Sequence, residues 1–146
     1  MEVLRDVDNR TKWDNNLREA KVIREFSDCF IIFRNVAPMP IIQDRDFVEK
    51  MLIFQHNGAY YIYYSSIPDK FFPPQSGYTR GYTMYAVNRI KKEGNKIIVR
   101  TSTQKDPQAS MSGFMSLGMV GGKSAENITN FRLRLMKQVR RVTNHS

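Results

Sequence analysis

The chain has few of the residues that build covalent or metal-centred sites. Its 146 residues include one cysteine, Cys29, and two histidines, His56 and His145. One cysteine cannot form an intramolecular disulfide, which favours a reducing compartment and predicts a cytoplasmic protein. His56 falls in a predicted turn and His145 lies beside the C-terminus, so the two lack the spacing of metal ligands. We therefore expect neither a metal site nor a cofactor.

Long apolar runs are also missing. No segment approaches the ~20 consecutive apolar residues that a membrane-spanning helix requires, so any membrane contact is expected to be peripheral. The first six residues are too acidic and too weakly apolar for a signal peptide. Acidic residues are outnumbered, with 14 Asp and Glu against 23 Lys and Arg, and the net charge of +9 favours anionic partners such as lipid headgroups, nucleic acid or acidic proteins.

Aromatic and β-forming residues, in contrast, are abundant and crowd the middle of the chain. Nine Phe and seven Tyr contribute to an aromatic content of 12%, and the length fits one domain over residues 1–146 with a single core. Alternating apolar and polar positions predict antiparallel strands, and Ser27-Asp28, His56-Asn57-Gly58 and Lys91–Asn95 predict turns between them. The predicted strands are 17–26, 29–36, 46–55, 59–66, 79–90 and 96–103.

The predicted strand 46–55 carries bulky apolar side chains on both faces. They are Phe47, Met51 and Ile53 on one face, and Val48, Leu52 and Phe54 on the other. Two interpretations stay open: the second face packs against a helix or a partner subunit, or it lines a ligand cavity. The preceding segment, Ala37–Asp44, is a predicted loop because two prolines prevent regular strand pairing, yet it is unusually apolar for a loop.

The last part of the chain changes to a helical period. Apolar residues recur at intervals of three and four positions, which predicts a long amphipathic helix. Its apolar positions are Ile128, Phe131, Leu135, Val139 and Val142. Arginines and lysines occupy other positions of this helix, and the basic face is either a solvated surface or a contact for an anionic membrane.

Several short motifs follow one another in a distinctive order. They are Arg10-x-x-Trp13-Asp14, Ala20–Ile23, Arg45–Val48, Tyr78–Gly81 and Asp106-Pro107, with the long helix after them. In this order the motifs resemble the START domain, the lipid-transfer module related to steroidogenic acute regulatory protein. The resemblance covers nearly the whole chain.

The resemblance implies an α+β helix-grip fold, similar to START and Bet v 1-like proteins. In this fold a curved antiparallel sheet packs around a long C-terminal α-helix, and one lipid occupies the tunnel between them. The resemblance also implies a lid for lipid entry, formed by the loop before the strand at 46–55 and by the C-terminal helix. Carried over to this chain, the lid and membrane-contact residues are Pro38, Met39, Pro40, Ile41 and Ile42.

The chain departs from the family pattern at two places. Only nine residues precede Arg10, where family members have a helix and further strands. We therefore expect an N-terminally truncated domain, with a bare sheet edge that a partner covers or that pairs in a homodimer. The second departure is Met51, six residues after Arg45, where sterol and phosphatidylcholine members usually have an arginine. Glu49 and Arg80 then become the candidate polar contacts to a lipid.

These inferences favour a non-enzymatic protein that binds one lipid in an apolar tunnel and transfers it between membranes, with transient contact to an anionic membrane surface. A phospholipid, a sterol and other lipids all remain open as the ligand. The predicted lipid-binding residues are Phe47, Glu49, Met51, Ile53, Tyr61, Tyr63, Arg80, Phe114, Leu117, Ile128 and Phe131.

Two other function classes are compatible with parts of the sequence. One is a helix-grip enzyme, such as a cyclase or hydrolase acting on a hydrophobic small molecule, with Glu49 and Tyr61 or Tyr63 as the catalytic candidates. The other is a basic nucleic-acid-binding module. It is less favoured, because the aromatic residues lie in apolar strands and not on an exposed basic platform.

Overall fold

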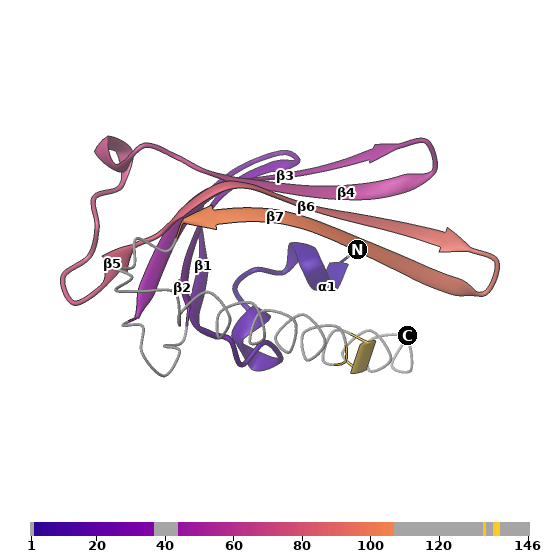
Figure 1. Ribbon diagram of the computed structural model, residues 1–146, viewed down its shortest axis with the longest axis horizontal. Coiled ribbons are helices and arrows are strands. Elements are labelled where there is room, and N and C mark those ends of the chain that lie inside the picture. The colour runs from indigo at the N-terminus through magenta and orange to yellow at the C-terminus, as the bar shows by residue number, and fades with distance from the viewer. Residues whose placement is uncertain (1, 37–43, 107–132, 134–135, 138–146) are drawn as a thin grey trace, which may run out of the picture.

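The described residues form one curved sheet with short helices near the N-terminus (Figure 1). The computed structural model describes residues 2–36 and 44–106, together with Leu133, Met136 and Lys137. The elements in chain order are α1 (Glu2–Arg5), η1 (Arg10–Lys12), β1 (Leu17–Phe26), β2 (Cys29–Val36), β3 (Arg45–His56), β4 (Ala59–Ser66), η2 (Asp69–Phe71), β5 (Thr79–Arg80), β6 (Tyr82–Glu93) and β7 (Lys96–Asp106).

The sheet has seven strands, and its order largely follows the chain. Strands β1, β2, β3, β4, β6 and β7 lie side by side in that order with antiparallel pairing, and the short β5 pairs parallel with β3. Strands that follow one another in the chain pair because tight turns join them. In the β3–β4 turn, Asn57 and Gly58 both adopt the positive φ that a tight hairpin of this kind requires. The sequence prediction of a curved antiparallel sheet is confirmed.

One predicted strand is wrong as a single element. The segment 79–90 is divided into β5, which pairs with β3, and β6, which pairs with β4. Gly81 lies at the break, where its N–H donates to the carbonyl of Asp46 at 2.9 Å. The predicted turn at 91–95 is also shorter than expected, because β6 continues to Glu93 and Gly94 turns the chain with φ of 58°.

The core lies on the concave side of the sheet, where α1 and the turn after it sit (Figure 1). There Leu4, Val7 and Trp13 pack against the sheet. We call this side the inner face; the buried residues that the strands supply to it are Leu17, Ala20, Phe30, Ile32, Met51, Ile62, Tyr64 and Ala86. The opposite side is the outer face.

The predicted C-terminal helix lies mostly outside the described residues. Its three described members, Leu133, Met136 and Lys137, are helical and exposed. The predicted lid residues 38–42 also lie outside the described part of the chain. Within that part, no helix is long and apolar enough to cross a bilayer.

Candidate functional site

The inner face combines an apolar surface with a row of polar side chains, which we call the polar row. All its members but Lys105 are buried; they are Arg10, Asp14, Arg34, Glu49, Tyr64, Thr83 and Lys105. The apolar part follows β3 and β4, where Met51 is paired with Tyr64 and Ile53 with Ile62. Paired residues on neighbouring strands point to the same face, so these four side chains share the inner face. Ile53 and Ile90 are only half-buried there and pack against the fully buried cluster.

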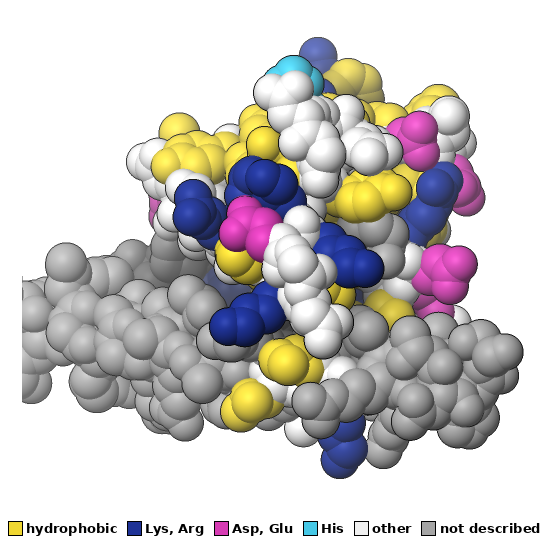
Figure 2. Space-filling view, turned by 90° about the vertical axis from the view of Figure 1, so that its right-hand side faces the viewer, with side chains coloured by type: hydrophobic (Ala, Val, Ile, Leu, Met, Phe, Trp, Pro, Cys, Tyr) yellow, Lys and Arg dark blue, Asp and Glu magenta, His cyan; other side chains and the backbone are white. Residues whose placement is uncertain are grey.

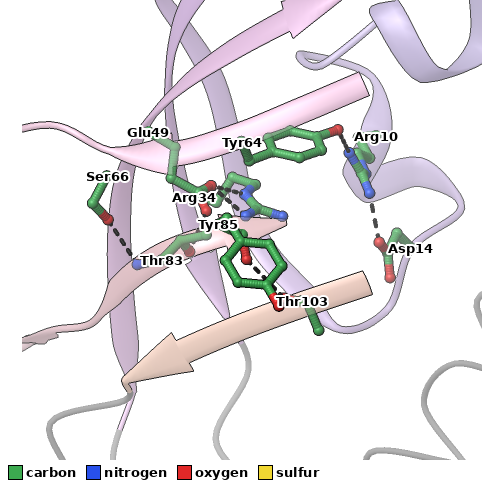
Figure 3. Close-up of polar contacts among 9 residues, drawn as sticks. All are labelled: Arg10, Asp14, Arg34, Glu49, Tyr64, Ser66, Thr83, Tyr85 and Thr103. Carbon is green, nitrogen blue, oxygen red and sulfur yellow. Dashed lines mark hydrogen bonds and ion pairs between the residues drawn. The ribbon is translucent and has the colours of Figure 1, made fainter. Parts of the chain in front are cut away.

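Glu49 is the centre of the polar row (Figure 3). It lies on β3, two positions before Met51, and its side chain is 0% exposed. Arg34 on β2 donates from Nε to Glu49 Oε2 at 2.7 Å, and its Nη2 also contacts that oxygen. Thr83 on β6 donates its hydroxyl to Glu49 Oε1 at 2.6 Å. Both carboxylate oxygens are therefore engaged by donors from other strands.

These contacts keep the Arg34–Glu49 pair ionised. Burial by itself raises the pKa of Glu49, but the opposite charges of Arg34 and Lys105 and the hydrogen bonds from Thr83 and Arg34 outweigh it and lower the pKa. Burial opposes the charge of Arg34 as well, and the attraction of Glu49 raises its pKa overall. A buried ion pair of this kind costs desolvation energy that only close pairing and full hydrogen bonding offset.

A second polar group continues the row toward the N-terminal segment. Arg10, in η1, donates from Nη1 to the Tyr64 hydroxyl at 3.3 Å, and its Nε lies 3.6 Å from Asp14 Oδ2. The guanidinium carbon of Arg34 lies 5.2 Å from the centroid of the same Tyr64 ring. Tyr64 thus joins the Arg10–Asp14 pair to the Arg34–Glu49 pair across the inner face (Figure 3).

Lys105 on β7 completes the polar row at the other side. It is paired with Thr83, and its ammonium nitrogen lies 5.2 Å from the centroid of the Phe47 ring. The side chain is exposed, yet protein atoms crowd the ammonium group. Desolvation and the charge of Arg34 therefore lower the pKa of Lys105 to about 8, against the opposing attraction of Glu49.

A separate ion-pair cluster lies on the outer face. Arg80 donates from Nε and Nη2 to the two oxygens of Asp46 at 3.0 and 2.9 Å. Its Nη1 donates to Asp69 Oδ1 at 2.8 Å and to the carbonyl of Phe72 at 3.0 Å. The Phe72 ring lies 6.2 Å from the buried Phe33 ring. These contacts hold the segment between β4 and β6 against the outer face.

At the hairpin end of the sheet, basic side chains lie among exposed hydrophobic ones (Figure 2). Phe54 and Tyr60, beside the β3–β4 turn, are 46% and 42% exposed, and Ile97, beside the β6–β7 turn, is 64% exposed. The end of the sheet thus presents apolar area to solvent together with basic side chains and some acidic ones (Figure 2).

The structure brings together some of the predicted site residues and separates others. Phe47, Glu49, Met51 and Ile53 alternate along β3 and share the inner face. Tyr61 and Tyr63 alternate with Ile62 and Tyr64, so their side chains lie on the outer face, as does Arg80, which pairs with Asp46. The predicted residues outside the described part of the chain are Phe114, Leu117, Ile128 and Phe131.

Several residues of the polar row were not predicted as site residues, although the sequence carried some signals. Arg34 is a charged residue in an otherwise apolar stretch, and it alternates with Ile32 and Phe30. Arg10 and Asp14 are four positions apart, which suits an ion pair over one helical turn. Lys105 and Thr83 gave no local signal, since only the strand register places them beside Glu49.

Comparisons with known proteins agree with this geometry. The START domain family matches residues 1–111. Human STARD10 has 20% identity and a TM-score of 0.82, covering 99% of this chain and 60% of the STARD10 chain. Human StAR-related lipid transfer protein 5 has 19% identity and a TM-score of 0.78, covering 97% of this chain and 71% of its own.

A bacterial structure is similar as well. The STAR-related lipid transfer protein of Xanthomonas axonopodis has 16% identity and a TM-score of 0.72, covering 92% of this chain and 76% of its own. At these identities the three structures establish the fold alone. No curated protein sequence matches the chain. Among the described residues, no group of three or more His, Cys, Asp or Glu side chains could hold a metal ion.

Proposed function

The chain belongs to the START domain family, and from this membership we propose that it binds one lipid against the inner face of the sheet and transfers it between membranes. The observation that carries the proposal is the division of the inner face into an apolar part and a polar row. Met51, Ile53 and Ile62 represent the apolar part, and Glu49 and Lys105 belong to the polar row. A lipid has two matching parts, an apolar body and a polar headgroup.

The apolar part suits an acyl chain or another aliphatic body. Each methylene group removed from water contributes roughly 0.8 kcal/mol, so even a partly enclosed chain gains useful affinity. Ile53 and Ile90 are half-buried at this surface and offer apolar area to a ligand. No specific polar contact is needed along such a chain, which leaves the choice of lipid to the polar row.

The polar row suits a headgroup with acceptor oxygens. Three cationic side chains, Arg10, Arg34 and Lys105, stand against two acidic ones, Asp14 and Glu49. Each arginine already has an acidic partner, whereas Lys105 is an exposed residue whose crowded ammonium group has a lowered pKa. A phosphate or carboxylate oxygen at Lys105 would balance the excess positive charge.

The same geometry argues against an enzyme that uses Glu49 as a general base. A base that works near neutral pH needs a pKa near 7, and the contacts around Glu49 lower its pKa instead. The alternative catalytic candidates, Tyr61 and Tyr63, lie on the other face of the sheet from Glu49. We therefore propose that the protein carries its ligand without chemical change.

Membrane contact is part of the proposal. Acidic lipid headgroups would attract a chain with a net charge of +9, and each Lys or Arg near the surface contributes about 1 kcal/mol. We propose that residues 38–42 form the lid and that the protein works in the cytoplasm with transient, peripheral contact to membranes. The exposed mixture of apolar and basic side chains at the hairpin end of the sheet offers a further contact (Figure 2).

The test is lipid uptake by variants of two adjacent residues on β3. Ile53 and Leu52 are both half-buried aliphatic residues, but only Ile53 packs against the inner cluster. Ile53→Asp is expected to reduce uptake of fluorescent lipid from vesicles much more than Leu52→Asp, when both variants are compared at equal folded fraction. Native mass spectrometry after mild purification should detect bound lipid in the wild type.

Two outcomes would contradict the proposal. One is wild-type protein that neither carries lipid nor takes it up from vesicles of zwitterionic or anionic composition. The other is an equal loss of uptake in Ile53→Asp and Leu52→Asp, which would place the ligand elsewhere than the inner face.

A further inference from the structure

On strands β3, β6 and β7 the inner face is polar at one end and apolar at the other. At the polar end, Thr83 on β6 donates to Glu49 on β3 and is paired with Lys105 on β7, so these three residues lie together. Toward the hairpin turns the same strands carry aliphatic residues on this face, namely Ile53, Ile90 and Val99. The gradient has the same direction on all three strands. It therefore gives an amphiphilic ligand one orientation, with its headgroup at the end where Lys105 lies.

The ammonium group of Lys105 lies in surroundings that disfavour its charge. One side of it faces the ring of Phe47, whose centroid is 5.2 Å away and which is only 5% exposed. The nearby carboxylate of Glu49 accepts from Arg34 at 2.7 Å, so its attraction for Lys105 is largely offset. Desolvation, together with the repulsion of Arg34 and Arg10, lowers the pKa of Lys105 to about 8. An anion beside the ammonium group would reverse this effect.

Given the proposed function, on which this inference rests, we propose that the ligand is a lipid with a net negative headgroup charge, carried by a phosphate or a carboxylate that binds Lys105. An ammonium group donates three hydrogen bonds, and those to an anionic oxygen are charge-assisted and strong. A zwitterionic headgroup would bring its own cation to an end of the face that already holds the charges of Arg34 and Arg10. The hydroxyl group of a neutral lipid would leave the charge of Lys105 without a counter-ion. A net anionic headgroup has neither disadvantage.

Binding of such a lipid depends on pH through Lys105. Its pKa is about 8 in the free protein, and only the protonated form attracts an anion, so affinity for an anionic lipid falls as the pH rises. The charged groups that face Lys105 are Glu49 on β3, Arg34 on β2 and Arg10 in η1, whereas β6 faces it with the uncharged Thr83. The pKa of Glu49 is lowered and that of Arg34 is raised, and arginine stays protonated in proteins. Of these groups, only Lys105 changes its charge near pH 8.

A matched lipid panel tests the proposal with the full 146-residue chain. Phosphatidylglycerol, phosphatidylcholine and a fatty acid, all with the same fluorescent acyl chain, are each added in trace amounts to phosphatidylcholine vesicles. The vesicle surface then has the same charge in every arm, so the attraction of a chain with net charge +9 to the membrane is constant. Uptake of an anionic probe into the protein should exceed that of phosphatidylcholine about tenfold, as one charge-assisted contact predicts. Comparison of the two anionic probes distinguishes a phosphate from a carboxylate.

Substitutions of Lys105 test the contact itself. Lys105→Met removes the charge at similar length and should lower the ratio of anionic to zwitterionic uptake about tenfold. Lys105→Arg keeps the charge and should retain most of the preference. Lys50→Met is the matched control, because Lys50 is an exposed lysine on β3 that alternates with Glu49 and Met51 and so lies on the outer face. It removes the same charge and should leave the ratio unchanged.

The same ratio measured across pH tests the proton linkage. Phosphatidylglycerol is the probe, because its phosphodiester keeps one negative charge throughout the range. In the wild type the ratio should fall between about pH 7 and about pH 10, toward the value of Lys105→Met, as Lys105 loses its proton. In Lys105→Arg the ratio should stay constant, because arginine remains protonated. Partial unfolding lowers the uptake of every probe, so the ratio reports headgroup recognition.

Three results would overturn the inference and leave the proposed function standing. The first is uptake of lipid without any preference for an anionic probe. The second is an equal loss of preference in Lys105→Met and Lys50→Met, which would assign it to the general positive charge of the protein. The third is a wild-type ratio that does not change with pH, which would exclude Lys105 as the contact. Uptake of no probe at all would instead overturn the proposed function, and this inference with it.

Discussion

The buried Arg34–Glu49 pair gives the most demanding test of the inner face. We expect Glu49→Gln to destabilise the fold strongly, because it leaves the guanidinium of Arg34 buried without a counter-ion. The Arg34 side chain is only 9% exposed and that of Glu49 is 0% exposed, so water cannot replace the lost partner. Removing one member of such a pair typically costs about 3–5 kcal/mol.

A loss of this size is easily measured. The free energy of unfolding of a domain is roughly 5–15 kcal/mol, so the variant should lose a large share of it. In urea, with a slope of about 1–3 kcal/mol per molar, the unfolding midpoint should fall by roughly 1–5 M. Arg34→Met/Glu49→Met should recover most of the loss, because replacing both members of a buried pair by apolar residues is often neutral or stabilising.

An exposed ion pair supplies the control. Arg5 and Glu25 lie 3.8 Å apart with side chains 46% and 59% exposed, so Glu25→Gln should cost less than about 1 kcal/mol. The effect of Glu49→Gln should also shrink in acid. The lowered pKa of Glu49 stabilises the folded state above its unfolded pKa, and this stabilisation is lost as the pH falls through the folded value. Equal small losses for Glu49→Gln and Glu25→Gln would refute the argument that burial of the pair determines its cost.

Three further perturbations follow from the same structure. Lys105→Met should stabilise the protein at pH 7, and the gain should disappear between pH 8 and 10.5, because folding lowers the pKa of Lys105 from 10.5 to about 8; denaturation across pH measures this. Gly81→Ala should cost about 1–3 kcal/mol, since a methyl group there would meet the Phe47 ring at 2.5 Å, and Phe47→Leu should recover part of the loss in urea unfolding. Met39→Asp/Ile42→Asp should slow vesicle-to-vesicle lipid transfer without lowering stability; an unchanged rate would remove the lid assignment.

The sequence determined the strands and most of their turns. The strand at 59–66 was predicted with the bounds that the structure has, because alternation along a strand and the Asn57-Gly58 turn are local signals. The order of motifs also identified the family, which the match over residues 1–111 confirms. The break at Gly81 was missed, because there the chain changes its pairing partner from β3 to β4, and both strands are distant in sequence.

Only the tertiary structure decided which side of each strand forms the inner face. Strand β4 carries aromatic or aliphatic residues at consecutive positions, so its pattern could not distinguish Tyr61 and Tyr63 from Ile62 and Tyr64. The register with β3 makes the choice, because it aligns Ile62 and Tyr64 with Ile53 and Met51. Tertiary structure also brings the residues of the polar row together. Arg10 and Tyr64 are 54 positions apart, and Lys105 lies near Glu49 only because β7 pairs with β6. Local propensity thus fixes where strands begin and end, whereas the charges that meet across the sheet depend on strand register, which no local stretch of sequence encodes.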